Sequence, residues 1–149
     1  MSILDGRAGG CVLDPPVITG DAIGSYDVTL KGYIKQVCPA FPWTPHTERM
    51  VDILQRVADG KLPPRLILQL PPRHYKSTTT SRLFSGWWLR RNPNQFVGLG
   101  SYGANLAAGF SRAARGYYLA SGGSLDRSSS ASNEWGTGQT GGMWAVGVD

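Results

Sequence analysis

Arg65–Thr80 reads RLILQLPPRHYKSTTT, and this stretch decides how the rest of the chain is interpreted. A short apolar run ends at two prolines, a turn with cationic and aromatic side chains follows, and hydroxyl residues then open a helical pattern. A strand, a turn and a helix in this order form the layout of a phosphate-binding loop, where backbone N–H groups and the helix N-terminus surround an anion. Lys76 and Ser77 stand where such loops place the lysine that reaches the β- and γ-phosphates and the hydroxyl that ligates Mg²⁺.

Two glycines of the general pattern G-x-x-x-x-G-K-[ST] are replaced here, by Leu70 and Tyr75. Glycine allows positive φ and a close approach of the backbone to phosphate, and a tyrosine at positive φ would be strained by roughly 1–3 kcal/mol. Spacing alone therefore leaves two interpretations open. One is a nucleotide-binding loop, and the other is an ordinary turn between a strand and a helix, in which Lys76 is a solvated residue of the first helical turn.

The heptapeptide Pro71–Ser77, PPRHYKS, resembles the P-P-R-H-G-K-S phosphate loop in the large terminase subunits of tailed phages. That family already lacks the first glycine, so Tyr75 is the departure from its pattern. The resemblance implies that ATP and Mg²⁺ are the ligands, that Ser77 holds the metal ion, and that Lys76 and Arg73 have the catalytic positions beside the γ-phosphate. It also implies a set of residues that line the bound phosphates: Arg73, His74, Tyr75, Lys76, Ser77 and Thr78.

The segment Phe41–Glu48, FPWTPHTE, lies about one helix upstream of the loop. It resembles the place where related motors hold the adenine base, and this resemblance implies that Trp43 and His46 stack on the base. The alternative from the residues themselves is a core tryptophan and an exposed histidine in the first turn of a helix.

Length and composition bound the class of protein. A chain of 149 residues is enough for a single domain, and its hydrophobic content of 41% is typical of globular proteins. No run approaches about 18 consecutive apolar residues, and the N-terminus lacks a basic-then-apolar signal segment, so we expect a soluble, cytosolic protein without a membrane span.

The charges are segregated along the chain. Residues 61–125 contain no Asp or Glu, which predicts a surface that meets polyanions such as nucleotides or a nucleic acid backbone. The alternative is a set of ordinary solvated helix faces. The same stretch contains nine cations: Lys61, Arg65, Arg73, Lys76, Arg82, Arg90, Arg91, Arg112 and Arg115.

Domain organisation follows from the local patterns. Residues 1–42 are rich in Gly, Pro and Asp without a sustained period, which predicts an irregular N-terminal arm, and residues 43–149 are predicted to form a partial P-loop ATPase domain. Pro45 opens an apolar helical pattern that Gly60 ends. A strand buried on both faces is expected at Leu66–Leu70.

The expected fold is an α/β class, with a three-layer, mostly parallel sheet of the P-loop NTPase type that is incomplete at the C-terminus. In that arrangement ligands sit at the carboxyl ends of strands. We expect a loop at Gly122–Gly142, where Ser and Gly are dense. The remaining expected elements are a helix at Ser77–Arg91, a strand at Gln95–Gly100, a helix at Asn105–Leu119 and a strand at Met143–Val148.

The run from Val97 to Arg112 resembles the terminase stretch of a strand, a Ser-Tyr pair and a helix with Phe-Ser-Arg. This resemblance implies that Arg112 or Arg115 contacts phosphate, on DNA or on the nucleotide of a neighbouring subunit. Solvation at the surface is the alternative for both side chains.

The family resemblance implies an N-terminal part of a viral DNA-packaging motor that drives double-stranded DNA into a procapsid. Its implied partners are double-stranded DNA, the portal protein, the small terminase subunit and further copies of the full-length chain, in the host cytoplasm and transiently on the procapsid portal. In the family the Walker B carboxylates and the nuclease domain follow later, so this chain by itself is expected to lack ATP hydrolysis and DNA cleavage. The alternatives are a helicase-like or recombination ATPase, a degenerate DNA-binding module without nucleotide, and a basic α/β domain without a ligand.

Overall fold

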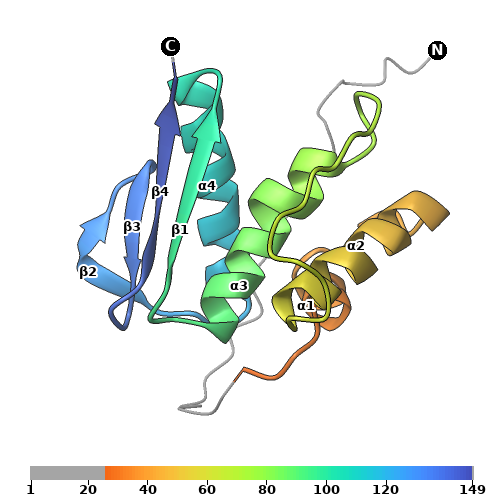
Figure 1. Ribbon diagram of the computed structural model, residues 1–149. Helices are drawn as coiled ribbons and strands as arrows, with labels where there is room; N and C mark the ends of the chain where they lie inside the picture. Colours follow the sequence, from red (N-terminus) through yellow and green to blue (C-terminus); the bar gives the residue numbers. More distant parts are fainter. Residues whose placement is uncertain (1–25, 149) are drawn as a thin grey trace, which may run out of the picture.

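The computed structural model describes residues 26–148, which form a mixed α/β fold with a sheet on one side and a group of helices on the other (Figure 1). The elements in chain order are α1 (Leu30–Val37), α2 (Pro45–Ala58), a π-helical segment η1 (Thr78–Phe84), α3 (Ser85–Arg91), β1 (Phe96–Ser101), α4 (Ala104–Ala120), β2 (Leu125–Ser130), β3 (Glu134–Thr137) and β4 (Gly142–Gly147).

The sheet is mixed and has the strand order β1-β4-β3-β2. β1 and β4 are parallel, with Phe96 opposite Gly142, whereas β3 runs antiparallel to both β4 and β2. The prediction of a mostly parallel sheet was therefore wrong. The cause is the segment Gly122–Gly142, which was predicted to be a loop but supplies β2 and β3. Trp135 and Thr137 are the alternate residues of β3 whose side chains face the interior. Their burial stabilises a hairpin that is otherwise polar.

One face of the sheet is covered by α4. Ala107 and Ala114 of this helix belong to one core cluster with Leu99 of β1 and with Met143 and Ala145 of β4. The alternate side chains of β1 and β4, among them Phe96, Trp144 and Val146, are exposed on the other face. In residues 26–148 the sheet thus has helices on one face, and the third layer of the prediction is not seen.

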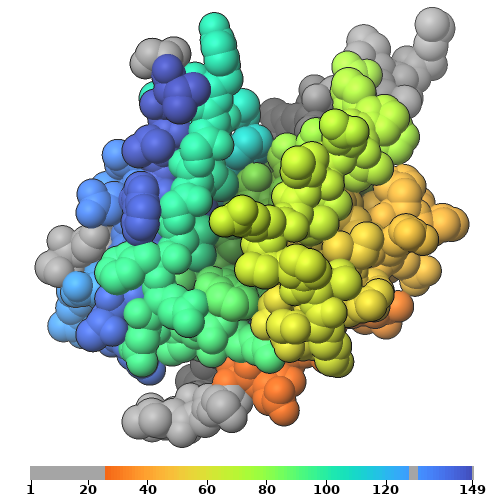
Figure 2. All heavy atoms as spheres, in the orientation of Figure 1, coloured from red at the N-terminus to blue at the C-terminus, as the bar shows by residue number. Residues whose placement is uncertain are grey.

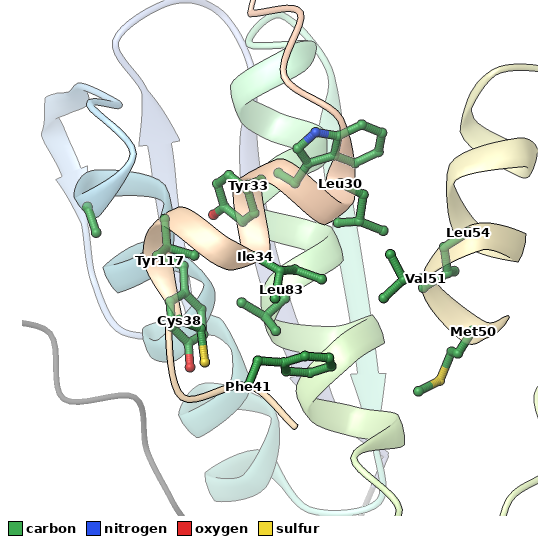
Figure 3. Close-up of a cluster of buried hydrophobic side chains, with 13 residues drawn as sticks. Leu30, Tyr33, Ile34, Cys38, Phe41, Met50, Val51, Leu54, Leu83 and Tyr117 are labelled. Atoms are coloured by element: carbon green, nitrogen blue, oxygen red, sulfur yellow. The ribbon is translucent and has the colours of Figure 1, made fainter. Parts of the chain in front are cut away.

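A second core joins the helices. Leu30, Tyr33 and Ile34 of α1 meet Met50 of α2 and Leu83 of η1 in this cluster (Figure 3). Helix α1 lies within the part predicted to be an irregular arm, and it forms because its apolar residues recur on one face and the Thr29 side chain caps its start. Residues 1–25 of the predicted arm lie outside the described residues.

Leu66–Leu70 is extended but joins no strand ladder, so the prediction of a strand buried on both faces was wrong. Leu68 and Leu70 pack against the helical core, whereas Ile67 is 85% exposed. The segment therefore packs on the helices through alternate side chains and leaves the others in solvent, instead of lying between two strands of the sheet.

Helix α2 ends at an ion pair that ties it to α3. Asp59 Oδ1 accepts from Arg91 Nη1 at 2.8 Å and from Gln55 Nε2 at 3.0 Å, and Lys61 Nζ lies 3.8 Å from its other oxygen. The hydrogen bond from Arg91, followed by that from Gln55, lowers the pKa of the Asp59 carboxyl.

Candidate phosphate-binding loop

The turn between Leu70 and Thr78 encloses a cavity of about 400 Å³ that is lined by these nine consecutive residues. Figure 1 shows the turn (yellow-green) above the column of η1 and α3. Proline at positions 71 and 72 ends the extended segment, because proline lacks the N–H that a further strand residue would donate. The helical backbone resumes at Lys76, so the loop leads directly into a helical start.

The backbone of the turn is left-handed at two positions. Arg73 has φ 64° and Tyr75 has φ 59°, while His74 between them does not have positive φ. Left-handed residues of this kind occur in the concave backbone nests that bind anions through successive N–H groups. Tyr75 stands at the glycine position of the motif and has a left-handed backbone, which glycine would adopt without strain. The strain that the sequence analysis described for a tyrosine at positive φ therefore applies to Tyr75.

The Tyr75 ring does not close the cavity. Its centroid lies 6.3 Å from that of Phe41 in an edge-to-face contact, and the side chain is 43% exposed. Phe41 is buried in the helical core and thereby fixes one side of the loop. Sequence analysis did not assign Phe41 a role, although it begins the segment that was compared with an adenine site.

The cationic side chains of the loop are available to a ligand. Arg73 and Lys76 are both exposed, and the side chain of neither forms a hydrogen bond or an ion pair with another residue of the range 26–148. Lys76 was predicted to neutralise the β- and γ-phosphates and Ser77 to hold Mg²⁺, and both line the cavity. Thr78 lines it as well.

His74 has a defined tautomer in its neutral form. Its Nδ1 lies 2.9 Å from the Pro72 carbonyl oxygen, which can only accept, so Nδ1 carries the proton and donates. The lone pair of the neutral ring is then on Nε2.

Of the two residues predicted to contact the base, His46 contacts the loop directly, whereas Trp43 is linked to it through Phe41. The rings of His46 and His74 lie edge to face with centroids 5.2 Å apart. Trp43 contacts the loop through Phe41, whose ring centroid is 4.9 Å away, and Lys31 Nζ lies 5.3 Å from the Trp43 ring centroid. The structure thus brings His46 beside the turn and places Trp43 one ring behind it.

Helix α2 positions His46 through its first turn. Thr44 and Thr47 form a reciprocal capping box, and Thr44 Oγ1 also lies 3.0 Å from Nδ1 of His46. Pro45 occupies the first helical position, where a missing N–H has no cost. These local contacts hold the imidazole close to the helix start, on the side that meets the loop.

The helix after the loop differs from the continuous α-helix that was predicted for Ser77–Arg91. The segment η1 is π-helical, whereas Ser77 before it and Ser85–Arg91 after it are α-helical. Thr79 Oγ1 and Thr80 Oγ1 donate to the carbonyl oxygens of Tyr75 and Lys76, both at 2.8 Å. Hydroxyls that bond back in this way compete with the regular helix ladder, which favours the wider turn.

Arg112 and Arg115 do not line the loop cavity. Both lie on α4, where Arg112 is exposed and Arg115 Nη1 donates to the Ala131 carbonyl oxygen at 3.2 Å. Contacts of these side chains with DNA or with a neighbouring nucleotide stay predictions.

Residues 26–148 contain no group of three or more His, Cys, Asp or Glu side chains that could hold a metal ion. The role of Ser77 as a ligand of Mg²⁺ stays a prediction. Within the same range no helix is both long and apolar enough to cross a lipid bilayer. Neither a protein-family model, nor a curated protein, nor a solved structure matches this chain.

Proposed function

We propose that the turn at Pro71–Thr78 binds the phosphates of ATP with Mg²⁺, and that the chain is the N-terminal part of the ATPase of a terminase large subunit. The observation that carries this proposal is the open cavity of about 400 Å³ bounded by the loop, in which Tyr75 has the left-handed backbone of the phosphate-loop glycine. Backbone amides would face the phosphates, and an anion there would also benefit from the helix start.

Each residue has a role set by its place in the loop. Lys76 would neutralise charge on the β- and γ-phosphates, Ser77 would ligate Mg²⁺, and Arg73 would sense or stabilise the γ-phosphate. His74 and Thr78 would line the phosphates, and His46 would contact the base from the start of α2. In the complete motor this binding would drive double-stranded DNA through the portal into a procapsid in the host cytoplasm, with the small terminase subunit and further copies of the chain as partners.

Binding without hydrolysis is the activity proposed for this chain by itself. ATP hydrolysis needs a carboxylate that orients or deprotonates water, in addition to the phosphate cradle. The carboxylates of residues 60–148 are Asp126 and Glu134, and both line a cavity on the sheet that shares no lining residue with the loop.

The experiment is an ATP titration by calorimetry with and without Mg²⁺, on the parent chain and on Lys76→Ala. Loss of one charge-assisted contact is expected to weaken ATP binding by roughly 10-fold to 100-fold. Lys35→Ala, which removes an exposed lysine of α1, is the matched control and should bind like the parent. Measurable ATP binding that Lys76→Ala leaves unchanged would overturn the loop proposal.

One observation favours a second function, a DNA-binding module that no longer handles nucleotide. Tyr75 is strained by its positive φ and places a bulky ring where the family has glycine. In that case duplex DNA would bind in a salt-dependent manner that ATP and Mg²⁺ do not alter, and the calorimetry would show no nucleotide binding.

A further inference from the structure

A second cavity, of about 380 Å³, lies on the face of the sheet that α4 does not cover. Its lining includes the side chains of Phe96, Asp126, Glu134 and Trp144 and the turn between β3 and β4. Figure 2 shows this face from the front, with β1 in teal beside β4 in dark blue and no helix over them. The cavity shares no lining residue with the phosphate loop, so an inference about it does not rest on the proposed function.

Two aromatic rings form one wall of this cavity. Phe96 and Trp144 are 61% and 46% exposed, and their ring centroids are 6.0 Å apart. The indole of Trp144 covers Gly98, since a Cβ placed on Gly98 would be only 3.0 Å from Trp144 Cζ2. The ring is therefore supported by the sheet on one side and presents its other side to a ligand.

The carboxylates of the second half of the chain converge on the same cavity. Asp126 and Glu134 are the only Asp or Glu residues in the described range 60–148, where the Lys and Arg residues number ten. Glu134 stands opposite Trp144 in the β3–β4 register. Asp126 lies beside Gly136 on the neighbouring strand: a Cβ atom placed on Gly136 would be 3.1 Å from the Cβ atom of Asp126. Negative charge in this half of the molecule is thus concentrated at one aromatic wall.

This combination selects a cation. The face of an indole attracts a cation through its quadrupole, and adjacent carboxylates accept its hydrogen bonds. The same carboxylates disfavour a nucleic acid, whose phosphates they would repel. A guanidinium fits better than an ammonium, because it is planar, stacks on aromatic rings and donates two parallel hydrogen bonds to a carboxylate.

We propose that this cavity binds an arginine-bearing segment of a partner polypeptide, with the guanidinium stacked on Trp144 and paired with Glu134. Asp126 lines the same cavity. Val146, two residues along β4 and 51% exposed, offers apolar surface to the alkyl stem of the arginine or to a neighbouring side chain.

The test is an NMR titration of the full chain, followed at the tryptophan indole N–H resonances. The probe is a short capped peptide with arginines in a glycine background, and its control is the same peptide with citrulline, which keeps the shape and loses the charge. The arginine peptide is expected to shift the Trp144 resonance in a saturable, salt-sensitive manner, and the citrulline peptide is expected to bind at least several-fold more weakly.

Two variants locate the binding. Glu134→Gln and Trp144→Leu change exposed side chains, and each is expected to weaken the affinity for the arginine peptide by roughly threefold, with about a tenfold loss in the double variant. Calorimetry with the same peptides measures these affinities, because variants at Trp144 lack the indole resonance. Glu48→Gln removes an exposed carboxylate of α2 and should leave binding unchanged. The absence of any saturable shift, equal binding of the citrulline peptide, or parent-like binding by the double variant would each overturn the proposal. The comparison of the two peptides on the parent chain stands even if a variant fails to fold.

Discussion

The imidazoles of His46 and His74 lie edge to face with ring centroids 5.2 Å apart, although the two residues belong to different elements. His46 is in the first turn of α2, and His74 is at the centre of the loop that leads into η1. The contact therefore places the ring proposed to bind the base beside the proposed phosphate site. A ligand with both a base and phosphates could meet the two parts at once.

Removal of the His46 ring is expected to affect ATP and inorganic pyrophosphate differently. Stacking of a base on an aromatic side chain contributes about 1–3 kcal/mol to binding, so His46→Ala should lower the affinity for ATP by roughly 5-fold or more. Pyrophosphate has no base, and its affinity should stay within about twofold. Competition titrations of both ligands on the parent and the variant measure this difference. Equal losses for the two ligands would place His46 at the phosphates instead.

Replacement of the strained tyrosine is expected to improve nucleotide binding. Tyr75→Gly removes roughly 1–3 kcal/mol of backbone strain, but it also loses the contact with Phe41 and adds the entropy cost of glycine, so thermal stability should change little. The backbone can then approach phosphate more closely, and ATP affinity should rise several-fold. Tyr75→Phe keeps both the ring and the strain, and it should bind like the parent. Weaker ATP binding by Tyr75→Gly in the same calorimetric titration would contradict this account.

A close contact inside the helical core predicts an unusual effect of alanine. In a helix Gly→Ala ordinarily stabilises by about 1 kcal/mol, but a Cβ at Gly86 would lie 2.5 Å from the Tyr33 hydroxyl oxygen and 3.0 Å from the Ala114 carbonyl oxygen. Gly86→Ala is therefore expected to destabilise the fold by about 1–3 kcal/mol in urea unfolding.

The same experiment has an internal rescue. Tyr33→Phe removes the nearer atom of the clash, so the double variant should recover part of the loss. Tyr33 is fully buried, and its hydroxyl has no hydrogen-bond partner in residues 26–148, so the single variant itself should be neutral or stabilising. Additive effects of the two substitutions would show that the clash is relieved elsewhere.

The Asp59 ion pair predicts a pH dependence of stability with a defined sign. Hydrogen bonds from Arg91 and Gln55 lower the pKa of Asp59 in the folded protein relative to the unfolded chain. The stabilisation is therefore present above the unfolded pKa of about 4 and is lost as pH falls through the lower folded pKa. Asp59→Asn should be less stable than the parent at pH 7, and the two should converge in acid.

Thermal unfolding at a series of pH values measures this convergence. Asp52→Asn, on the exposed side of the same helix, is the control and should change the midpoint little at any pH. A difference between the parent and Asp59→Asn that persists unchanged below the unfolded pKa would rule out the ion pair as its cause.

Much of the fold could be predicted because it is local. The helix from Pro45 and the helix predicted at Asn105–Leu119 agree with α2 and α4, and the two strands predicted at Gln95–Gly100 and Met143–Val148 agree with β1 and β4. Their apolar residues repeat at the period of their own element, so the pattern contains the information. At the loop, the motif indicated that a tyrosine with the positive φ of the motif's glycine would be strained, and Tyr75 does have positive φ.

Other features depend on partners far away in the chain, and the sequence by itself did not determine them. The polar segment around β2 and β3 forms a hairpin because Trp135 and Thr137 are buried against other elements. Leu66–Leu70 has the apolar composition of a strand, but no strand of the described sheet pairs with it. Strand pairing and ring contacts are non-local: their free energy comes from neighbours that only the folded chain brings together. For this reason the sequence determined the helices α2 and α4 and the place of the turn after Pro72. Tertiary structure alone decided the direction of the sheet, the meeting of His46 with His74 and the convergence of Asp126 and Glu134 on Trp144.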